Sequence, residues 1–184
     1  MTAVIRVLMR AAAFLVGLLL IAIVLVWWTS RPPSDTSLTR QFFQREDDMN
    51  RILAMMNQDV QMNRIALDFL WKEDNAGWPR PEAQWGISLE RWNEYRALFE
   101  KVGSQAGIIR RERSSDVMID MWGAGIVPSG TSVSYLHCGS PGNGLEHTEP
   151  PCLKRDTAGS GQYRRLSYRY TRLTDDWYIY QEIW

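Results

Sequence analysis

The residues with the most distinctive chemistry are two cysteines and two histidines that lie close together in the sequence. Cys138 and Cys152, the only cysteines, flank a loop without an apolar pattern. In an oxidising compartment such a pair forms a disulfide, which for a loop of about 15 residues is worth roughly 3 kcal/mol. With His137 and His147 they also supply two nitrogens and two sulfurs, the ligand set of a structural zinc site. Because His137 and Cys138 are adjacent and would point to opposite faces of a strand, the spacing favours the disulfide. We expect no metal and no other cofactor.

Several carboxylates could act as general acids or bases, but no catalytic signature accompanies them. The sequence contains no Gly-x-Ser-x-Gly, His-Glu-x-x-His or Walker pattern. A hydrolase of envelope material would need a cleft that combines some of four residues, namely Asp116, Asp120, His137 and Glu146. Solvated turns and strand faces explain the same carboxylates more simply. We therefore expect a protein without catalytic activity, and a hydrolase is the least favoured alternative.

Arginine and tyrosine residues alternate with other residue types along two expected strands, and both types are common at the energetic centres of protein interfaces. Together with one loop tryptophan they could form a single face that binds an acidic protein partner or polyanionic envelope material. The alternative is an ordinary polar sheet face whose charges are balanced by neighbouring acids. The expected partner-binding residues are Arg111, Arg164, Arg169, Tyr168, Tyr170 and Trp78.

Residues 11–28 determine the compartment in which all of these groups lie. They are eighteen consecutive residues without a charge. At about 1.5 Å of rise per residue it covers roughly 27 Å, close to the thickness of the bilayer hydrocarbon. Arg6 and Arg10 precede it and Trp27 and Trp28 end it, which predicts a transmembrane anchor with residues 1–10 in the cytoplasm. A cleaved signal peptide and a buried soluble helix are the alternatives, although the residues after Trp28 form a poor cleavage site.

Residues 29–37 contain two prolines and are predicted to be a linker, and residues 38–184 have the size of one extracytoplasmic domain. Apolar residues at helical spacing predict helices over 38–61 and 88–102, the second with Ser88 as N-cap and Gly103 at its end. Residues 65–71 alternate like a strand, although a continuing helix would also fit. Five β-rich runs follow, at 107–113, 117–122, 131–138, 163–173 and 177–184, and the last two are expected to form a hairpin.

Helices followed by a strand meander predict an α+β fold, with two main helices packed on a five- or six-stranded, mainly antiparallel sheet. Without Arg6 and Arg10, the 21 basic residues become 19 against 21 acidic ones, so the net charge outside the membrane is about −2. This balance argues against a nucleic-acid partner.

The sequence is thus typical of a single-pass inner-membrane protein with a periplasmic binding domain. The function it favours is an immunity protein that inhibits a toxic enzyme delivered to the periplasm. The main alternative is an accessory subunit of a cell-envelope assembly.

Overall fold

A computed structural model describes residues 14–22, 24, 31–72, 81–111, 116–126, 129–139, 152 and 167–183. The chain divides into two compact units, Met1–Arg31 and Pro32–Trp184. In the first unit residues 14–22 are helical, and the rest of the expected anchor, apart from Val24, lies outside the described residues. No helix among the described residues combines the length and the apolar composition needed to cross a membrane. The anchor over 11–28 and the cytoplasmic placement of residues 1–10 therefore stay predictions.

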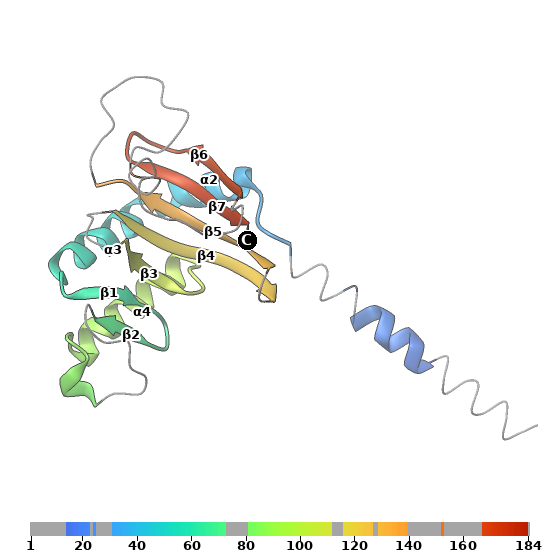
Figure 1. The fold of residues 1–184 in the computed structure, drawn as a ribbon, viewed down its shortest axis with the longest axis horizontal. Coiled ribbons are helices and arrows are strands. Elements are labelled where there is room, and N and C mark those ends of the chain that lie inside the picture. Colours follow the sequence, from blue (N-terminus) through green and yellow to red (C-terminus); the bar gives the residue numbers. More distant parts are fainter. Residues whose placement is uncertain are drawn as a thin grey trace, which may run out of the picture. The chain divides into compact units, whose positions relative to one another are not determined.

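The second unit is an α+β domain in which helices pack on an antiparallel sheet (Figure 1). Its described strands form one seven-stranded sheet in the order β2-β1-β3-β4-β5-β7-β6, with every neighbouring pair antiparallel. The strands are β1 (Met62–Ile65), β2 (Leu70–Lys72), β3 (Gly107–Arg110), β4 (Val117–Ile126), β5 (Ser129–His137), β6 (Ser167–Arg172) and β7 (Trp177–Ile183).

The sheet has more strands than the five or six expected because the strand predicted over 65–71 is wrong. That region is a hairpin of β1 and β2, and the residues between them turn the chain, with the Ala66 N–H donating to the Phe69 carbonyl at 2.9 Å. Alternating apolar residues continue through this turn, so the sequence pattern does not distinguish it from one longer strand.

The single helix expected over 38–61 is also wrong, because two helices, α2 (Asp35–Gln44) and α3 (Glu46–Gln58), occupy this region. The first begins at Asp35, and its N-cap is Ser34. Arg45, with φ of −128°, separates the two helices. The break is followed by three acidic residues, Glu46, Asp47 and Asp48, which stabilise the N-terminus of a new helix.

The helix predicted over 88–102 is confirmed as α4 (Leu89–Val102). The Ser88 hydroxyl accepts a hydrogen bond from the Arg91 N–H at 3.2 Å, and Gly103 ends the helix in the left-handed conformation with φ of 71°. Both caps follow from residue chemistry alone, because a serine oxygen satisfies a free N–H and glycine adopts positive φ without strain. A short 3-10 helix, η1 (Glu82–Gln84), precedes it.

The core lies between these helices and one face of the sheet. Phe42 of α2 is fully buried, with its ring 5.5 Å from those of Tyr135 on β5 and Trp177 on β7. The Tyr135 hydroxyl donates to the Leu38 carbonyl at 2.7 Å, and the Trp177 indole N–H donates to Asn50 at 3.3 Å. These contacts fix α2 and α3 on the sheet, so its opposite face, termed here the far face, is left without a helix among the described elements.

The expected hairpin of the last two strands is confirmed as β6 and β7, joined through residues 173–176. Tyr170 is paired with Tyr180 across the strands, and Tyr168 stacks on Tyr180 with ring centroids 5.8 Å apart. Aromatic cross-strand pairs of this kind stabilise hairpins. The disulfide between Cys138 and Cys152 is confirmed as well.

Candidate functional site

Neighbouring residues along a strand point to opposite sides of the sheet, so the far face and the helix-covered face carry different side chains. Direct cross-strand partners point to the same side and therefore form rows across the far face. Its central row runs from Asp120 on β4 through Ser134 on β5 and Tyr180 on β7 to Tyr170 on β6. The next row contains Ser132, Glu182 and Tyr168, and the row on the other side contains Arg64, Ile109, Met118, Leu136, Tyr178 and Arg172.

A cavity of about 530 Å³ opens on this face, where β1, β3 and β4 meet the ends of β5 and β7. Its wall combines charged, polar and apolar groups, which is the usual composition of a ligand site. The lining residues are Arg64, Gln105, Ala106, Ile109, Met118, Asp120, Trp122, Gly123, Ser132 and Glu182. This cavity, hereafter the far-face cavity, is the candidate functional site.

Asp120 is a carboxylate of the far-face cavity that makes hydrogen bonds through both of its oxygens. Its Oδ2 accepts from Arg64 Nη2 at 3.1 Å and its Oδ1 accepts from the Ser134 hydroxyl at 2.9 Å. Both side chains of the ion pair are largely buried, with exposed fractions of 23% for Arg64 and 22% for Asp120. Burial raises the pKa of the Asp120 carboxyl, and the Ser134 hydrogen bond and the Arg64 charge oppose that rise. Asp120 is therefore held in one orientation by two partners.

Glu182 is the second carboxylate of the far-face cavity, and it has a different environment. Burial is the main cause that raises its pKa; the charge of Arg111 lowers it and the charge of Asp120 raises it further. No described residue donates a hydrogen bond to this carboxylate. A half-buried carboxylate without such a donor destabilises the folded state when it ionises.

This environment predicts the effect of replacing Glu182 with glutamine. Burial penalises the charged form only in the folded state, so the penalty is absent below the pKa of the unfolded chain and complete above the raised folded-state pKa. Glu182→Gln should therefore increase the free energy of unfolding at pH 7, and the difference from wild type should vanish as the pH falls below the carboxyl range. Urea titrations at several pH values measure this difference in the free energy of unfolding. A difference that did not change with pH would contradict a burial penalty on ionised Glu182. Glu100→Gln, on the exposed face of α4, is the control.

A cluster of buried residues adjoins the far-face cavity and contains the disulfide. Cys138 and Cys152 are 1% and 3% exposed and pack with Leu136, Tyr178 and Tyr180. Since these three residues belong to the far face, the disulfide brings Cys152 onto that face of the sheet. Cys152 therefore covers one part of the far face, and the far-face cavity lies in another part.

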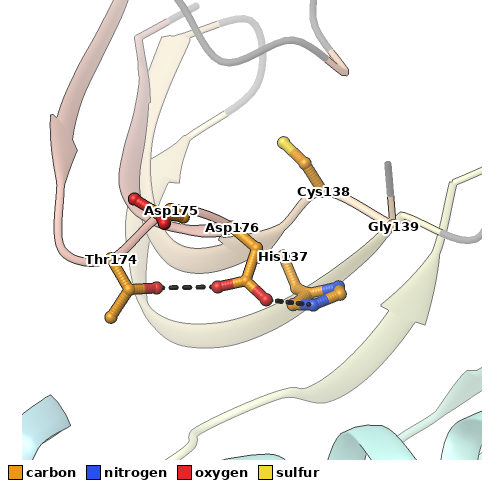
Figure 2. A pocket seen from close by; sticks show the side chains of 6 residues that line it. All are labelled: His137, Cys138, Gly139, Thr174, Asp175 and Asp176. Atoms are coloured by element: carbon orange, nitrogen blue, oxygen red, sulfur yellow. Dashed lines mark hydrogen bonds and ion pairs between the residues drawn. The ribbon is translucent and has the colours of Figure 1, made fainter. Parts of the chain in front are cut away.

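A second pocket, of about 570 Å³, lies where β5 ends beside the β6–β7 turn. Figure 2 shows its polar chain, in which Asp176 accepts from the Thr174 hydroxyl at 2.8 Å and lies 3.2 Å from Nε2 of His137. The same Thr174 oxygen accepts from the Trp177 N–H at 3.1 Å, so the chain organises the turn. No cysteine thiol is available here, because Cys138 is in the disulfide.

The three hydrolase candidates that the structure describes are not assembled into one cleft. Asp120 lines the far-face cavity, His137 lines the second pocket, and the Asp116 carboxylate accepts from the Gly139 N–H at 2.9 Å. Glu146 and His147 lie outside the described residues. Within the described part of the chain no group of three or more histidine, cysteine or acidic residues could hold a metal ion.

The expected arginine and tyrosine face is divided between the two sides of the sheet. Tyr168 and Tyr170 lie on the far face, and the charge of Arg111 acts on Tyr180 and Glu182 there. Arg169 points to the other side, where it forms an ion pair of 2.8 Å with Asp35 of α2. The expectation of one face was wrong on this point, because neighbouring strand residues point in opposite directions. Arg164 and Trp78 lie outside the described residues.

Sequence reasoning missed Arg64, Ser134 and Glu182 as residues of the site. Arg64 and Asp120 are 56 residues apart, and they meet only because β1 and β4 both pair with β3. The one local signal was Glu182, a carboxylate on a strand whose alternate residues are apolar or aromatic.

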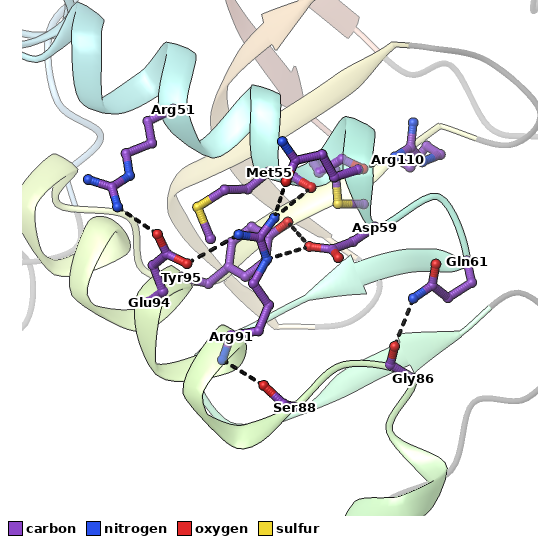
Figure 3. A network of polar contacts seen from close by, with 12 residues as sticks. Arg51, Met55, Asp59, Gln61, Gly86, Ser88, Arg91, Glu94, Tyr95 and Arg110 are labelled. Carbon is purple, nitrogen blue, oxygen red and sulfur yellow. Dashed lines mark hydrogen bonds and ion pairs between the residues drawn. The ribbon is translucent and has the colours of Figure 1, made fainter.

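A network of charged side chains joins α3 and α4 (Figure 3). The Arg91 guanidinium contacts Asp59 at 2.9 Å, Glu94 at 3.1 Å and the Met55 carbonyl at 3.4 Å, and the Tyr95 hydroxyl donates to Asp59 at 2.8 Å. Arg91 thereby caps the C-terminus of α3, whose last turn contains no basic residue. The network is a structural clamp between α3 and α4.

We expect Arg91→Ala to lower the free energy of unfolding by about 2 kcal/mol, because Asp59, only 15% exposed, would lose its ion-pair partner. The matched control is Arg51→Ala, since Arg51 pairs with Glu94 but is 58% exposed. That change should cost below about 1 kcal/mol. Urea denaturation followed by tryptophan fluorescence measures both changes. Equal losses of unfolding free energy would show that Arg91 stabilises the domain no more than the exposed Arg51 does.

No protein-family model, no curated protein and no solved structure matches this chain.

Proposed function

We propose that this protein is a non-catalytic binding protein anchored by residues 11–28 in the inner membrane, with its C-terminal domain in the periplasm. Its partner is a toxic enzyme delivered to that compartment, which it inhibits as an immunity protein. The contact surface is the far face around the cavity.

The observation that carries this proposal is the combination of an exposed aromatic side chain and a charged cavity on one sheet face. Tyr168 is 50% exposed, is fixed by stacking on Tyr180, and shares a row with Glu182 of the cavity. Rigid aromatic groups beside a partly desolvated pocket are typical of interface hot spots. Asp120 supports a binding role over acid–base chemistry, because its two oxygens are engaged by Arg64 and Ser134.

The proposed location draws on the chain outside the sheet. An uncharged run over 11–28 that follows Arg6 and Arg10 favours an anchor with the domain on the periplasmic side. The disulfide between Cys138 and Cys152 is consistent with that oxidising compartment.

Site-specific photo-crosslinking in living cells tests the proposal. A photoreactive phenylalanine analogue replaces Tyr168 on the far face in one strain and Phe43, which is 53% exposed on α2, in the control strain. We expect a covalent adduct with an exported enzyme from position 168 only. The purified full-length protein should then inhibit that enzyme. An adduct with an integral envelope protein would favour the accessory-subunit alternative, and equal adducts from both positions would contradict the far-face assignment.

Once the partner is known, alanine at position 168 gives a quantitative check. Tyr168→Ala should weaken the complex by about tenfold or more, as loss of an aromatic hot spot does. Phe43→Ala should leave the affinity unchanged. An unchanged affinity for both variants would remove Tyr168 from the contact surface.

A further inference from the structure

The far-face cavity has a chemically uneven wall. Its lining includes the apolar residues Ile109 and Met118 and the polar residues Ser132 and Glu182. A ligand group that fills this space must therefore offer both apolar surface and polar hydrogen-bonding groups.

The charges of the wall are partly satisfied before any ligand arrives. Arg64 and Asp120 neutralise each other at 3.1 Å, and Asp120 has a second partner in Ser134. Glu182 is left with two carboxylate oxygens to which no described residue donates a hydrogen bond. Arg111 acts on Glu182 by its charge, but it does not line the cavity. Arg64 Nε is also buried without a hydrogen-bond partner among the described residues, so the lining offers one donor beside this carboxylate acceptor. The carboxylate is the group that calls for a cationic donor.

We infer that the far-face cavity receives the guanidinium group of an arginine side chain presented by the partner, with Glu182 as its carboxylate acceptor. This inference rests on the proposed function, since it names the group by which the partner is anchored. A guanidinium fits better than an ammonium because its planar fork matches two carboxylate oxygens and it is more weakly hydrated. Its alkyl stem also suits Met118 and Ile109.

Replacement of Glu182 by glutamine is expected to change binding and folding stability in opposite directions. Burial of Glu182 penalises the ionised form, so a neutral glutamine at this position is expected to stabilise the domain and to weaken guanidinium binding. A residue that stabilises the fold less than its neutral isostere is typical of a functional site. Loss of binding in Glu182→Gln therefore cannot be attributed to misfolding.

The test uses the full-length chain in detergent micelles, with isotope-labelled methionine and isoleucine methyl groups observed by NMR. The probe is N-acetyl-arginine methylamide, and the matched control probe is N-acetyl-citrulline methylamide, which has the same shape without the charge. We expect the arginine probe to shift the Met118 and Ile109 methyl signals with a Kd on the order of 1 mM, as befits a fragment of an interface. Met56 and Ile52, buried in the core, should not respond.

The citrulline probe should bind about tenfold or more weakly, and Glu182→Gln should weaken the arginine probe to a similar extent, since each change removes one charge of a charge-assisted hydrogen bond. Glu100→Gln should change nothing. Equal binding of both probes, undiminished binding to Glu182→Gln, or no response at Met118 and Ile109 would overturn the inference. So would an equally tight lysine analogue, because it would show that the guanidinium fork is not recognised.

The two proposals fail separately. If a photo-crosslink forms at position 168 with an exported enzyme but the cavity ignores the arginine probe, the binding function stands and the cavity assignment falls. If the probe binds but position 168 yields no adduct, the cavity is a guanidinium site and the proposed partner surface is wrong.

Discussion

Replacing Gly107 with alanine should destabilise the domain by about 4 kcal/mol or more, the largest effect of any single substitution considered for this protein. Gly107 has φ of 85°, and a Cβ atom there would lie 2.0 Å from the Ile65 carbonyl oxygen and 2.8 Å from the Ala66 Cα. Both atoms belong to the backbone, so the clash cannot be relieved by rotating a side chain. Positive φ adds strain of about 1–3 kcal/mol for a residue other than glycine.

Gly107 also connects the helices to the far-face cavity. It is paired with Asp120 across β3 and β4, and its N–H donates to the buried Ser104 hydroxyl at 3.0 Å. The Ser104 hydroxyl also donates to the Asp120 carbonyl at 2.7 Å. A displaced Gly107 would therefore move Asp120 as well, and the arginine probe should bind less tightly to any Gly107→Ala protein that folds.

Two other glycines serve as controls for this prediction. Gly103 has a similar φ of 71°, but its added Cβ would meet only the amide end of the Gln41 side chain, which can move. Gly103→Ala should therefore cost about 1 kcal/mol. At Gly123 no atom comes closer than 4.0 Å, and alanine there should change the stability by less than about 1 kcal/mol. Urea denaturation measures all three, and similar losses at positions 103 and 107 would contradict the role of the backbone clash.

Removal of the disulfide is expected to have the second largest effect. The double variant Cys138→Ala/Cys152→Ala should lose about 3 kcal/mol, because the unfolded chain regains the freedom of a loop that spans 14 residues of sequence separation. Both sulfur atoms are buried beside Leu136, Tyr178 and Tyr180, so the substitutions also remove packing on the far face.

Reduction provides the matching experiment. Wild-type protein denatured with a reducing agent should lose nearly the same free energy of unfolding as the double variant, whereas the variant should not respond to that agent. A loss below about 1 kcal/mol would show that the loop is held in place by contacts other than the disulfide. A reducing agent that affected both proteins equally would point to a cause outside these two cysteines.

The features that depend on neighbouring residues could be predicted from the sequence. Ser88 and Gly103 predicted both ends of α4, because a capping hydroxyl and a positive φ are local requirements. The aromatic alternation of residues 177–183 predicted the β6–β7 hairpin, and the two cysteines around a pattern-free loop predicted the disulfide. The α+β class followed from the order of these elements.

Local patterns were misleading where a short interruption did not disturb the apolar spacing. The break at Arg45 divides one apolar stripe between α2 and α3, and the turn after Ala66 divides one alternating run between β1 and β2. The position of each break depends on how the two halves pack on the rest of the domain. The residues inside the segment do not encode that packing.

The candidate site depends on strand pairing and could not be predicted from the sequence. Asp120 was one of several unremarkable carboxylates until pairing through β3 placed it beside Arg64, which is 56 residues away, and pairing with β5 placed it beside Ser134. The same strand alternation moved Arg169 to the opposite side of the sheet from Tyr168 and brought Glu182 to the cavity. Far-apart residues meet through strand register, and register is a property of the whole sheet that no single stretch of sequence specifies.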